Sequence, residues 1–268
     1  MHNWKKYNGA IIPLVPPHIH VDEKGIKSKV KNSNAFFARW TSDFDCKEAT
    51  EFWYVICDKF IDIEGLSVNT RSKVRRGLKK CEVRLIDKVC LMKSGYDCYL
   101  SAFSKYSTYL KPKTKIQFQD EIQSLTDNWD LWGVFHDNKM IGYSQNLVID
   151  NYCDYSTIKF NPDFLKLYSS YILFYTMNRY YLFEKGFRYV NDGARSISHE
   201  TNIQSYLIDK FKFRKAYCKL NIIYSPKIKL ILTLIYPFRW FFSLLDFGPF
   251  SKLNILIFQE KIKRTYER

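Results

Sequence analysis

Hydrophobic and polar residues alternate most clearly in the middle of the chain. The segments LWGVFHD and MIGYSQNLVID are joined by the polar pair Asn138–Lys139, and Asn151 leads into a third segment, NYCDYSTIKF. Alternating segments separated by short polar turns are typical of antiparallel strands. We therefore predict a three-stranded antiparallel meander from Leu131 to Phe160.

Residues with helical spacing precede the meander. In SVNTRSKVRRGLKK, Val74 and Leu78 are four residues apart and follow the possible caps Asn69 and Thr70. The segment GYDCYLSAFSKYSTYL repeats apolar residues at helical spacing as well. Both segments are predicted to be helices, because an apolar residue at every third or fourth position forms one buried face.

A long apolar run follows the meander. FLKLYSSYILFYTMNRYYLFEKG, residues 164–186, is long enough for a buried helix that Gly186 ends. Thr201 and Gln204 have the spacing of a capping box that begins a helix with one apolar face. Five further segments have strand composition: AFFARW, EFWYVICDKF, EVRLI, FRYVND and RKAYCKLNIIYSP.

This order of elements predicts an α/β fold, a mixed but mostly antiparallel sheet with helices on both faces. The chain contains no repeat and no Pro/Gly-rich linker. We therefore expect one main domain, residues 1–226 with its core at about 50–225, and a C-terminal helical arm, residues 227–268, that is both apolar and basic.

Composition narrows the possible partners. The 42 Lys and Arg residues exceed the 27 Asp and Glu residues, which gives a formal charge of +15. We expect an anionic partner, which could be a nucleotide cofactor, RNA or an acidic membrane surface. The seven cysteines are scattered without a CxxC pair, and His18 and His20 have no third ligand nearby. We therefore expect reduced thiols and no metal. Because no apolar signal segment is present, we also expect a cytoplasmic protein.

Functional groups concentrate in VNDGARSISHETNIQ, residues 190–204. This segment follows a predicted strand and precedes a predicted helix, and in open α/β sheets ligands bind at such strand ends. Two interpretations remain open. The segment lines a functional site, or its side chains only cap the helix and Asp192 pairs with Arg195.

Three stretches, in this order, resemble the GNAT acyltransferase superfamily and its Fem-like branch. They are the basic TRSKVRRGLKK, the meander with the helix and strand that follow it, and ETNIQSYLIDKFKFRKAY. In the last stretch, Asn202, Lys210 and Phe213 match the family's closing pattern of Asn, helix, Lys-Φ-Gly-Phe and strand. The resemblance covers roughly residues 50 to 225.

The resemblance implies transfer of an acyl group to an amine. The donor is usually acyl-CoA, with acetyl-CoA as the first candidate, and in the Fem branch it is aminoacyl-tRNA. In this fold two central strands separate, and the donor's pyrophosphate lies on the N-terminus of the helix after the meander. The residues implied to bind the cofactor are Lys166, Tyr168, Ser169, Ser170, Arg195 and Ser196. The family's usual glycines are absent from this loop, FLKLYSSY.

Amine acylation needs a base, donors to an oxyanion and an acid for the leaving group. His199 and Glu200 are the candidate bases, and Asn202 could face the oxyanion. The family's usual tyrosine acid is replaced by Ile208, which makes the nearby Tyr206 the candidate acid.

The basic stretch predicts an anion-binding surface. The residues Arg71, Lys73, Arg75, Arg76, Lys79, Lys80 and Arg84 have only Glu82 among them. Arg71, Arg75 and Arg76, with Asp192, are the predicted substrate- or anion-binding residues, for RNA, a nucleotide phosphate or lipid headgroups. The alternative is a solvated helix face.

Residues 227–268 are apolar but contain Pro237 and Arg239, and no run is long enough to cross a bilayer. Tyr236 and Trp240 beside basic residues favour a helix lying on an anionic membrane. The alternative is an arm that packs on the core or on a second subunit.

Together these features predict an N-acyltransferase that acts on a small-molecule or lipid-linked amine acceptor, such as an envelope or polysaccharide precursor. It would be peripheral at the inner face of the membrane. A Fem-like aminoacyltransferase that uses aminoacyl-tRNA and a non-catalytic binding protein with the same fold are the alternatives.

Overall fold

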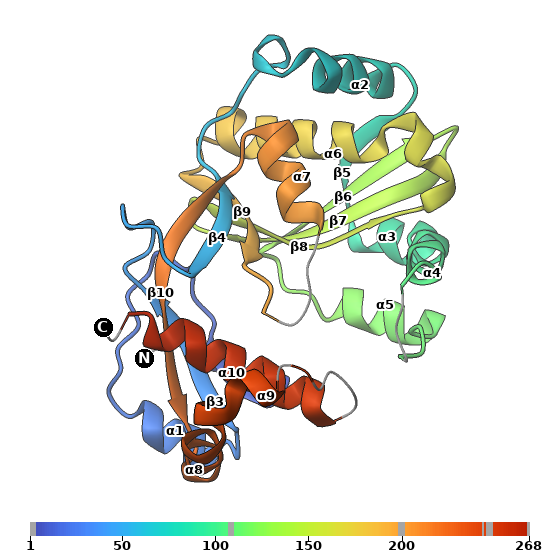
Figure 1. Ribbon diagram of the computed structural model, residues 1–268. Coiled ribbons are helices and arrows are strands. Elements are labelled where there is room, and N and C mark those ends of the chain that lie inside the picture. Colours follow the sequence, from blue (N-terminus) through green and yellow to red (C-terminus); the bar gives the residue numbers. More distant parts are fainter. Residues whose placement is uncertain (1–3, 107–109, 198–201, 243, 245–248, 267–268) are drawn as a thin grey trace. The chain divides into compact units, whose positions relative to one another are not determined.

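The computed structural model describes residues 4–106, 110–197, 202–242, 244 and 249–266. It divides into two compact units (Figure 1). The first unit contains Met1–Tyr54, Ala194–Thr201 and Lys215–Arg268, and the second contains Val55–Gly193 and Asn202–Arg214.

The strands of the first unit follow the order β1-β2-β3-β10-β4, and the last two of these also extend into the second unit. Its strands are β1 (Trp4–Tyr7), β2 (Ala10–Pro13), β3 (Phe37–Ser42), β4 (Phe52–Cys57) and β10 (Arg214–Tyr224). Its helices are α1 (Ile26–Asn32), α8 (Pro226–Ile235), η4 (Tyr236–Phe238), α9 (Arg239–Phe242) and α10 (Pro249–Arg264). Most of the described residues of the arm predicted over 227–268 are thus helical.

Helices cover both faces of the first unit's sheet. Ile26 and Val30 of α1 pack against Trp40 of β3 in one buried cluster. On the opposite face, Ile262 of α10 packs against Phe37 and Leu220. The C-terminal arm is therefore anchored to the sheet by α10. Within the described residues, no helix combines the length and the hydrophobicity that a membrane crossing needs.

The second unit carries the predicted meander. Its strands are β5 (Glu82–Ile86), β6 (Trp129–His136), β7 (Lys139–Ile149), β8 (Tyr152–Phe160) and β9 (Tyr189–Ala194). Its helices are η1 (Ile63–Gly65), α2 (Val68–Leu78), α3 (Lys88–Ser94), α4 (Tyr96–Phe103), α5 (Lys115–Gln123), η2 (Pro162–Leu167), α6 (Ser169–Asn178), η3 (Arg179–Glu184) and α7 (Asn202–Phe211).

The sheet of the second unit has the order β9-β8-β7-β6-β5. All neighbours pair antiparallel except β8 and β9, which are parallel, so the predicted mixed, mostly antiparallel sheet is confirmed. The first turn lies at Asp137 and Asn138, both with positive φ (47° and 61°), one residue before the predicted pair. Two consecutive residues with positive φ suit a tight hairpin turn.

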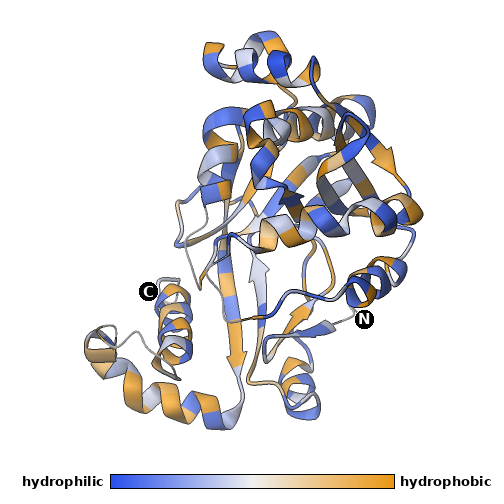
Figure 2. Ribbon diagram, turned by 90° about the vertical axis from the view of Figure 1, so that its right-hand side faces the viewer, coloured by the Kyte–Doolittle hydropathy of each residue, from blue (hydrophilic) through white to orange (hydrophobic). Residues whose placement is uncertain are grey.

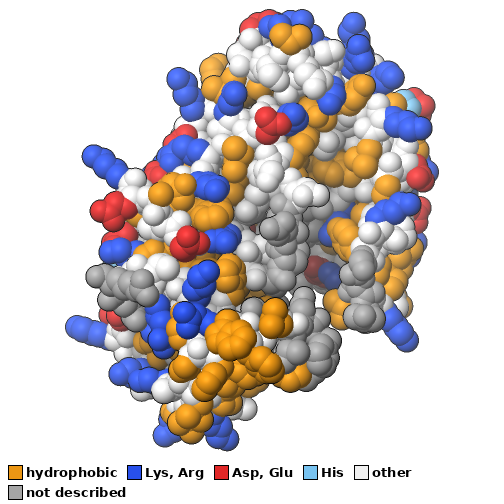
Figure 3. Space-filling view, in the orientation of Figure 1, with side chains coloured by type: hydrophobic (Ala, Val, Ile, Leu, Met, Phe, Trp, Pro, Cys, Tyr) orange, Lys and Arg blue, Asp and Glu red, His pale blue; other side chains and the backbone are white. Residues whose placement is uncertain are grey.

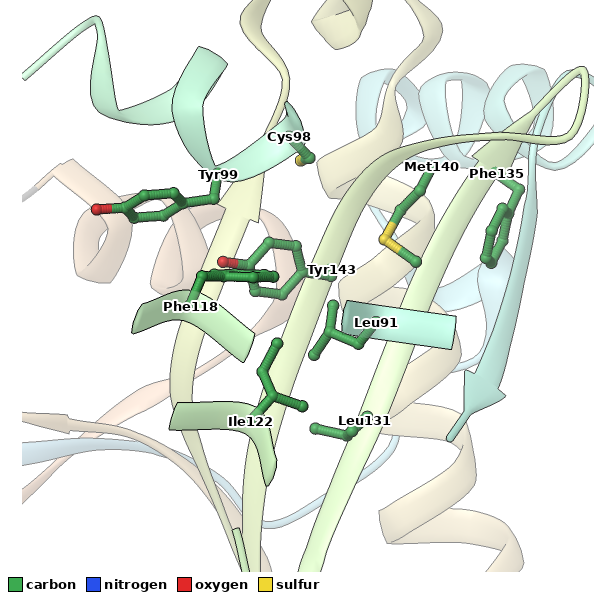
Figure 4. Packing of buried hydrophobic residues seen from close by; sticks show 9 residues of the cluster. All are labelled: Leu91, Cys98, Tyr99, Phe118, Ile122, Leu131, Phe135, Met140 and Tyr143. Carbon is green, nitrogen blue, oxygen red and sulfur yellow. The ribbon is translucent and has the colours of Figure 1, made fainter. Parts of the chain in front are cut away.

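Helices α3, α4 and α5 enclose one buried hydrophobic cluster of this unit against β6 and β7 (Figure 4). Leu91, Phe118 and Ile122 of the helices meet Leu131 and Tyr143 of the strands there. The alternation predicted in the meander supplies this face, because residues two apart along a strand point to the same side.

The opposite face of the sheet packs against α6. The predicted single helix over 164–186 is in fact three pieces: the 3₁₀ segment η2, α6 and the π-helical η3. In η3 the buried Tyr181 hydroxyl donates to Asp130 Oδ2 at 2.9 Å and accepts from Trp132 Nε1 at 2.9 Å. The spacing of apolar residues could not predict these breaks, because the π turn occurs where Tyr181 bonds to polar groups of β6, which are distant in sequence.

Helix α2 packs directly on the start of α6. Its N-cap is Ser67, whose hydroxyl accepts from Thr70 N at 3.3 Å, and not Asn69 or Thr70 as predicted. At Gly77, an added Cβ would lie 2.5 Å from Ile172 Cγ2 and 3.3 Å from the Leu167 carbonyl oxygen. The glycine therefore permits the close approach of α2 to α6.

Replacing this glycine tests the packing. We expect Gly77→Val to lower the free energy of unfolding by about 2 kcal/mol, because overpacking against the buried Ile172 exceeds any gain in helix propensity. Urea unfolding measures the change. Arg76→Val, which places the same side chain at an exposed position of α2, is the control. An equal loss in both variants would contradict the close approach.

Candidate active site

The sheet opens between β8 and β9. Their ladder comprises three pairs, Tyr152 with Tyr189, Cys153 with Val190 and Asp154 with Asn191, although β8 continues to Phe160 and β9 to Ala194. Beyond the last pair, the register of β8 with β7 shifts at Ser156. A bulge bends its strand and increases the local twist, so β8 turns away from β9 after Asp154.

Polar side chains join the two strands where the ladder ends. Asn191 Nδ2 donates to Asp154 Oδ1 at 2.8 Å and to the Tyr152 hydroxyl at 3.0 Å. Ser156 Oγ donates to Asp154 Oδ2 at 3.0 Å. Both oxygens of Asp154 therefore accept hydrogen bonds.

Asp192, the next residue along β9, is half-buried and lies in a different electrostatic setting. Burial, followed by the nearby negative charge of Asp154, raises the pKa of Asp192 to about 8. A carboxyl group whose pKa lies near neutral pH suits proton transfer, because it can both accept and release a proton there. This role differs from the substrate or anion binding predicted for Asp192.

Asp192 lies on the α6 side of the sheet. Consecutive residues of a strand point to opposite faces, so Asp192 faces away from the side that Asn191 and Asp154 share. The charge of Asp192 also acts on Tyr155, whose hydroxyl donates to Asn178 Oδ1 of α6 at 2.8 Å. The titrating carboxyl and α6 thus occupy the same face.

The N-terminus of α6 has the features of an anion site. Tyr168 precedes the helix with φ 62°, a left-handed conformation that replaces the missing glycine of this loop. The Ser169 hydroxyl is buried and has no hydrogen-bond partner among the residues that the structure describes. Ser170 follows in the first turn, and Lys166 is exposed just before it. The first-turn N–H groups of a helix attract anions.

A chain of polar side chains covers this helix start. Lys73 Nζ donates to the Tyr171 hydroxyl at 3.2 Å and lies 5.0 Å from the centroid of its ring. The Tyr206 hydroxyl donates to Ser170 Oγ at 3.2 Å, and the rings of Tyr171 and Tyr206 are 5.3 Å apart. Burial raises the pKa of Tyr206, so this tyrosine keeps its proton at neutral pH. The structure thus brings Ser170 and Tyr206, both predicted from the sequence, together.

The arginines predicted on α2 have different surroundings. Arg71 NH1 is 3.0 Å from Glu64 Oε2, and Arg75 also pairs with Glu64. The exposed Arg76 has no ion-pair partner in the described parts of the chain. Lys73 of α2, in contrast, contacts Tyr171 of α6.

The remaining predicted residues have other positions in the chain. His199 and Glu200 lie outside the described residues, and Asn202 is the exposed first residue of α7. Arg195 and Ser196 belong to the first unit. There Arg195 NH1 is 3.0 Å from Glu51 Oε2, and its guanidinium lies 4.5 Å from the ring centroid of Trp53.

Asp154 was absent from the sequence-based set, and Lys73 was named there only as a member of the basic stretch. Asp154 lies inside the aromatic strand NYCDYSTIKF, and a carboxylate in such a central strand was the available signal. Lys73 lies one residue before Val74 and four before Gly77, both buried, so its position on α2 places it beside the packed face.

Comparisons with known proteins bear on the fold. No protein-family model and no curated protein matches the sequence. Among solved structures, FemX matches with a TM-score of 0.57 and 9% identity, over 87% of this chain and 85% of FemX. The C-terminal domain of a protein named as a lysylphosphatidylglycerol synthetase from Agrobacterium fabrum matches with a TM-score of 0.54 and 10% identity, over 86% of this chain and 83% of that chain.

A third structure, L-PGS from Bacillus licheniformis, has a TM-score of 0.50 and 8% identity, over 86% of this chain and 83% of that chain. At these identities the likeness concerns the fold. The chain has a GNAT-like fold of the Fem-related kind, which confirms the fold predicted from its sequence.

Proposed function

We propose that this protein transfers an acyl group from an activated, phosphate-containing donor to an amine. One observation supports this most: Asp192, whose pKa is near 8, lies on the same face of the sheet as α6, whose N-terminus suits phosphate. A base that is partly ionised near neutral pH and an anion site are the two parts that amine acylation from such a donor needs.

The proposed step is a nucleophilic substitution at the acyl carbon. The amine nitrogen bonds to this carbon while its proton passes to the Asp192 carboxylate. The bond to the leaving thiolate or ribose oxygen breaks, and Tyr206, which is neutral because burial raises its pKa, is the group that protonates the leaving atom. His199 and Glu200, the bases predicted from the sequence, are the alternatives to Asp192 in this step, and Asn202 keeps its predicted role as a donor to the oxyanion.

Acyl-CoA is the proposed donor, with its pyrophosphate on Ser169, Ser170 and the neighbouring Lys166 and Lys73. Aminoacyl-tRNA is the second candidate, favoured by the exposed Arg76 on α2. One of the similar structures is named for lysylphosphatidylglycerol synthesis, which suits a lipid-linked acceptor here. A protein with this fold that binds the donor without transfer is the non-catalytic alternative.

The first prediction concerns the base. We expect Asp192→Asn to lower kcat/KM by about a hundredfold or more, the usual contribution of a general base. In the unchanged protein, kcat/KM should rise with pH and level off above about 8, as Asp192 ionises.

Asp154→Asn is the matched variant. It removes the charge that raises the pKa of Asp192, so the inflection should move to lower pH while much of the activity remains. An unchanged inflection in Asp154→Asn, or full activity of Asp192→Asn with every acyl donor, would contradict the assignment.

The second prediction concerns stability. The folded pKa of Asp192, about 8, exceeds the unfolded value, so the stability that its protonated form contributes is complete at low pH and is lost as pH rises toward 8. Asp192→Asn does not ionise and escapes this loss. The Tm of the variant relative to the unchanged protein should therefore increase from about pH 5 to about pH 9. If the difference in Tm stayed constant with pH, Asp192 would titrate as a solvent-exposed carboxyl, and the prediction would be wrong.

The third prediction concerns the donor. Acetyl-CoA should raise the Tm, and Lys73→Ala should weaken its binding by about fivefold to tenfold, as expected for loss of a charged hydrogen bond. Isothermal titration gives the Kd. Arg75→Ala, on the same helix but paired with Glu64, is the control and should bind as before. No Tm shift with any acyl-CoA, together with tRNA binding that weakens steeply with salt, would favour aminoacyl-tRNA.

A further inference from the structure

The helical arm of the first unit exposes a stripe of apolar side chains. Leu230, Leu234, Phe238 and Phe241 are 63%, 64%, 59% and 49% exposed. Their spacing of four, four and three residues places them along one side of the α8–η4–α9 segment, which we call the outer stripe. Figure 2 shows hydrophobic residues along most of α8, and Figure 3 shows a hydrophobic patch in this region of the first unit.

The other side of α8 is occupied by the protein itself. Leu232 is only 3% exposed, and Ile228 and Tyr236 line a groove of about 1840 Å³. A helix that is apolar on both sides needs two apolar environments. The first unit supplies one of them, and the outer stripe faces away from it.

The groove beside the outer stripe is strongly basic. Its only carboxylate among the described lining residues is Glu260, which is buried and accepts from Arg264 Nε at 2.7 Å. The cations that line it are Lys27, Lys31, Lys227, Lys229, Arg239, Lys261, Lys263 and Arg264.

Two of these cations converge on one ring. The guanidinium of Arg239 lies 5.0 Å from the ring centroid of Tyr236, and that of Arg264 lies 4.0 Å from the same centroid. Arg264 is already paired with Glu260, but among the described lining residues this one carboxylate faces eight cations, and an anion in the groove would relieve their mutual repulsion. The forked geometry of arginine suits a phosphate in this position.

We propose that the α8–α9 surface, the outer stripe together with the basic groove, docks on a membrane that contains anionic phospholipid. The outer stripe enters the boundary between headgroups and acyl chains, and Arg239, Arg264 and the groove lysines hold the lipid phosphates. A second copy of the chain is a poor occupant, because it would bring two basic surfaces together. The inference concerns the first unit alone and does not depend on the proposed transfer reaction.

Vesicle flotation with the full chain tests this surface. The protein should float with vesicles of equal parts phosphatidylcholine and phosphatidylglycerol, and much less with phosphatidylcholine alone. Leu234→Gln combined with Phe238→Gln should weaken partitioning by about tenfold or more, since each loses apolar burial in the membrane. The matched control is Val89→Gln with Ile116→Gln, two side chains of the second unit that are 66% and 69% exposed. It should float as the unchanged protein does.

The charge is tested separately. Lys227→Gln with Lys229→Gln leaves the Glu260–Arg264 pair intact, and it should weaken flotation by about tenfold at low salt and less at high salt. Equal flotation on both kinds of vesicle, or equal loss in the Leu234/Phe238 variant and its control, would overturn the proposal. So would a dimer in light scattering that the Leu234/Phe238 variant abolishes.

Discussion

The early end of the β8–β9 ladder is the constraint on which the candidate site of the second unit depends. A fully hydrogen-bonded parallel pair leaves no space between its strands, whereas here pairing ends at Asp154 and Asn191 and the bulge at Ser156 turns β8 aside. Backbone groups beyond that point need other partners, and side chains supply one of them: Asn191 Oδ1 accepts from Gly193 N at 3.0 Å. Gly193, with φ 97°, allows the backbone to bend there.

The same opening explains the contrast between two neighbouring carboxyl groups. Asp154 accepts hydrogen bonds from two side chains on one face, Asn191 Nδ2 and Ser156 Oγ. Asp192 lies on the other face, where burial opposes ionisation and the charge of Asp154 adds to the effect. A buried carboxyl group with a raised pKa lowers the stability of the fold at high pH, where it must ionise. Such a loss of stability is expected of a group that serves proton transfer.

Local patterns predicted much of this fold and less of its site. The meander was predictable because its strands alternate and its turns are polar, and the resemblance in residue order gave the architecture. The breaks around α6 were not, because the left-handed Tyr168 and the π turn at Tyr181 depend on contacts with residues far away in sequence. Asp154 was missed for a related reason. Asp154 stands out because the β8–β9 ladder ends there, and the sequence of β8 alone does not show how far β9 pairs with it.

The sequence also could not decide which side of the C-terminal arm is buried. Its sequence is apolar on several sides of the helix, which fits both a buried arm and a membrane-facing one. Packing decides between them residue by residue: Leu232 and Ile262 are buried in the first unit, while Leu230 and Leu234 are not. Isolated exposed apolar residues are common on protein surfaces, but a continuous stripe beside converging arginines is not explained by folding alone. The two interpretations of the sequence therefore apply to different sides of one arm.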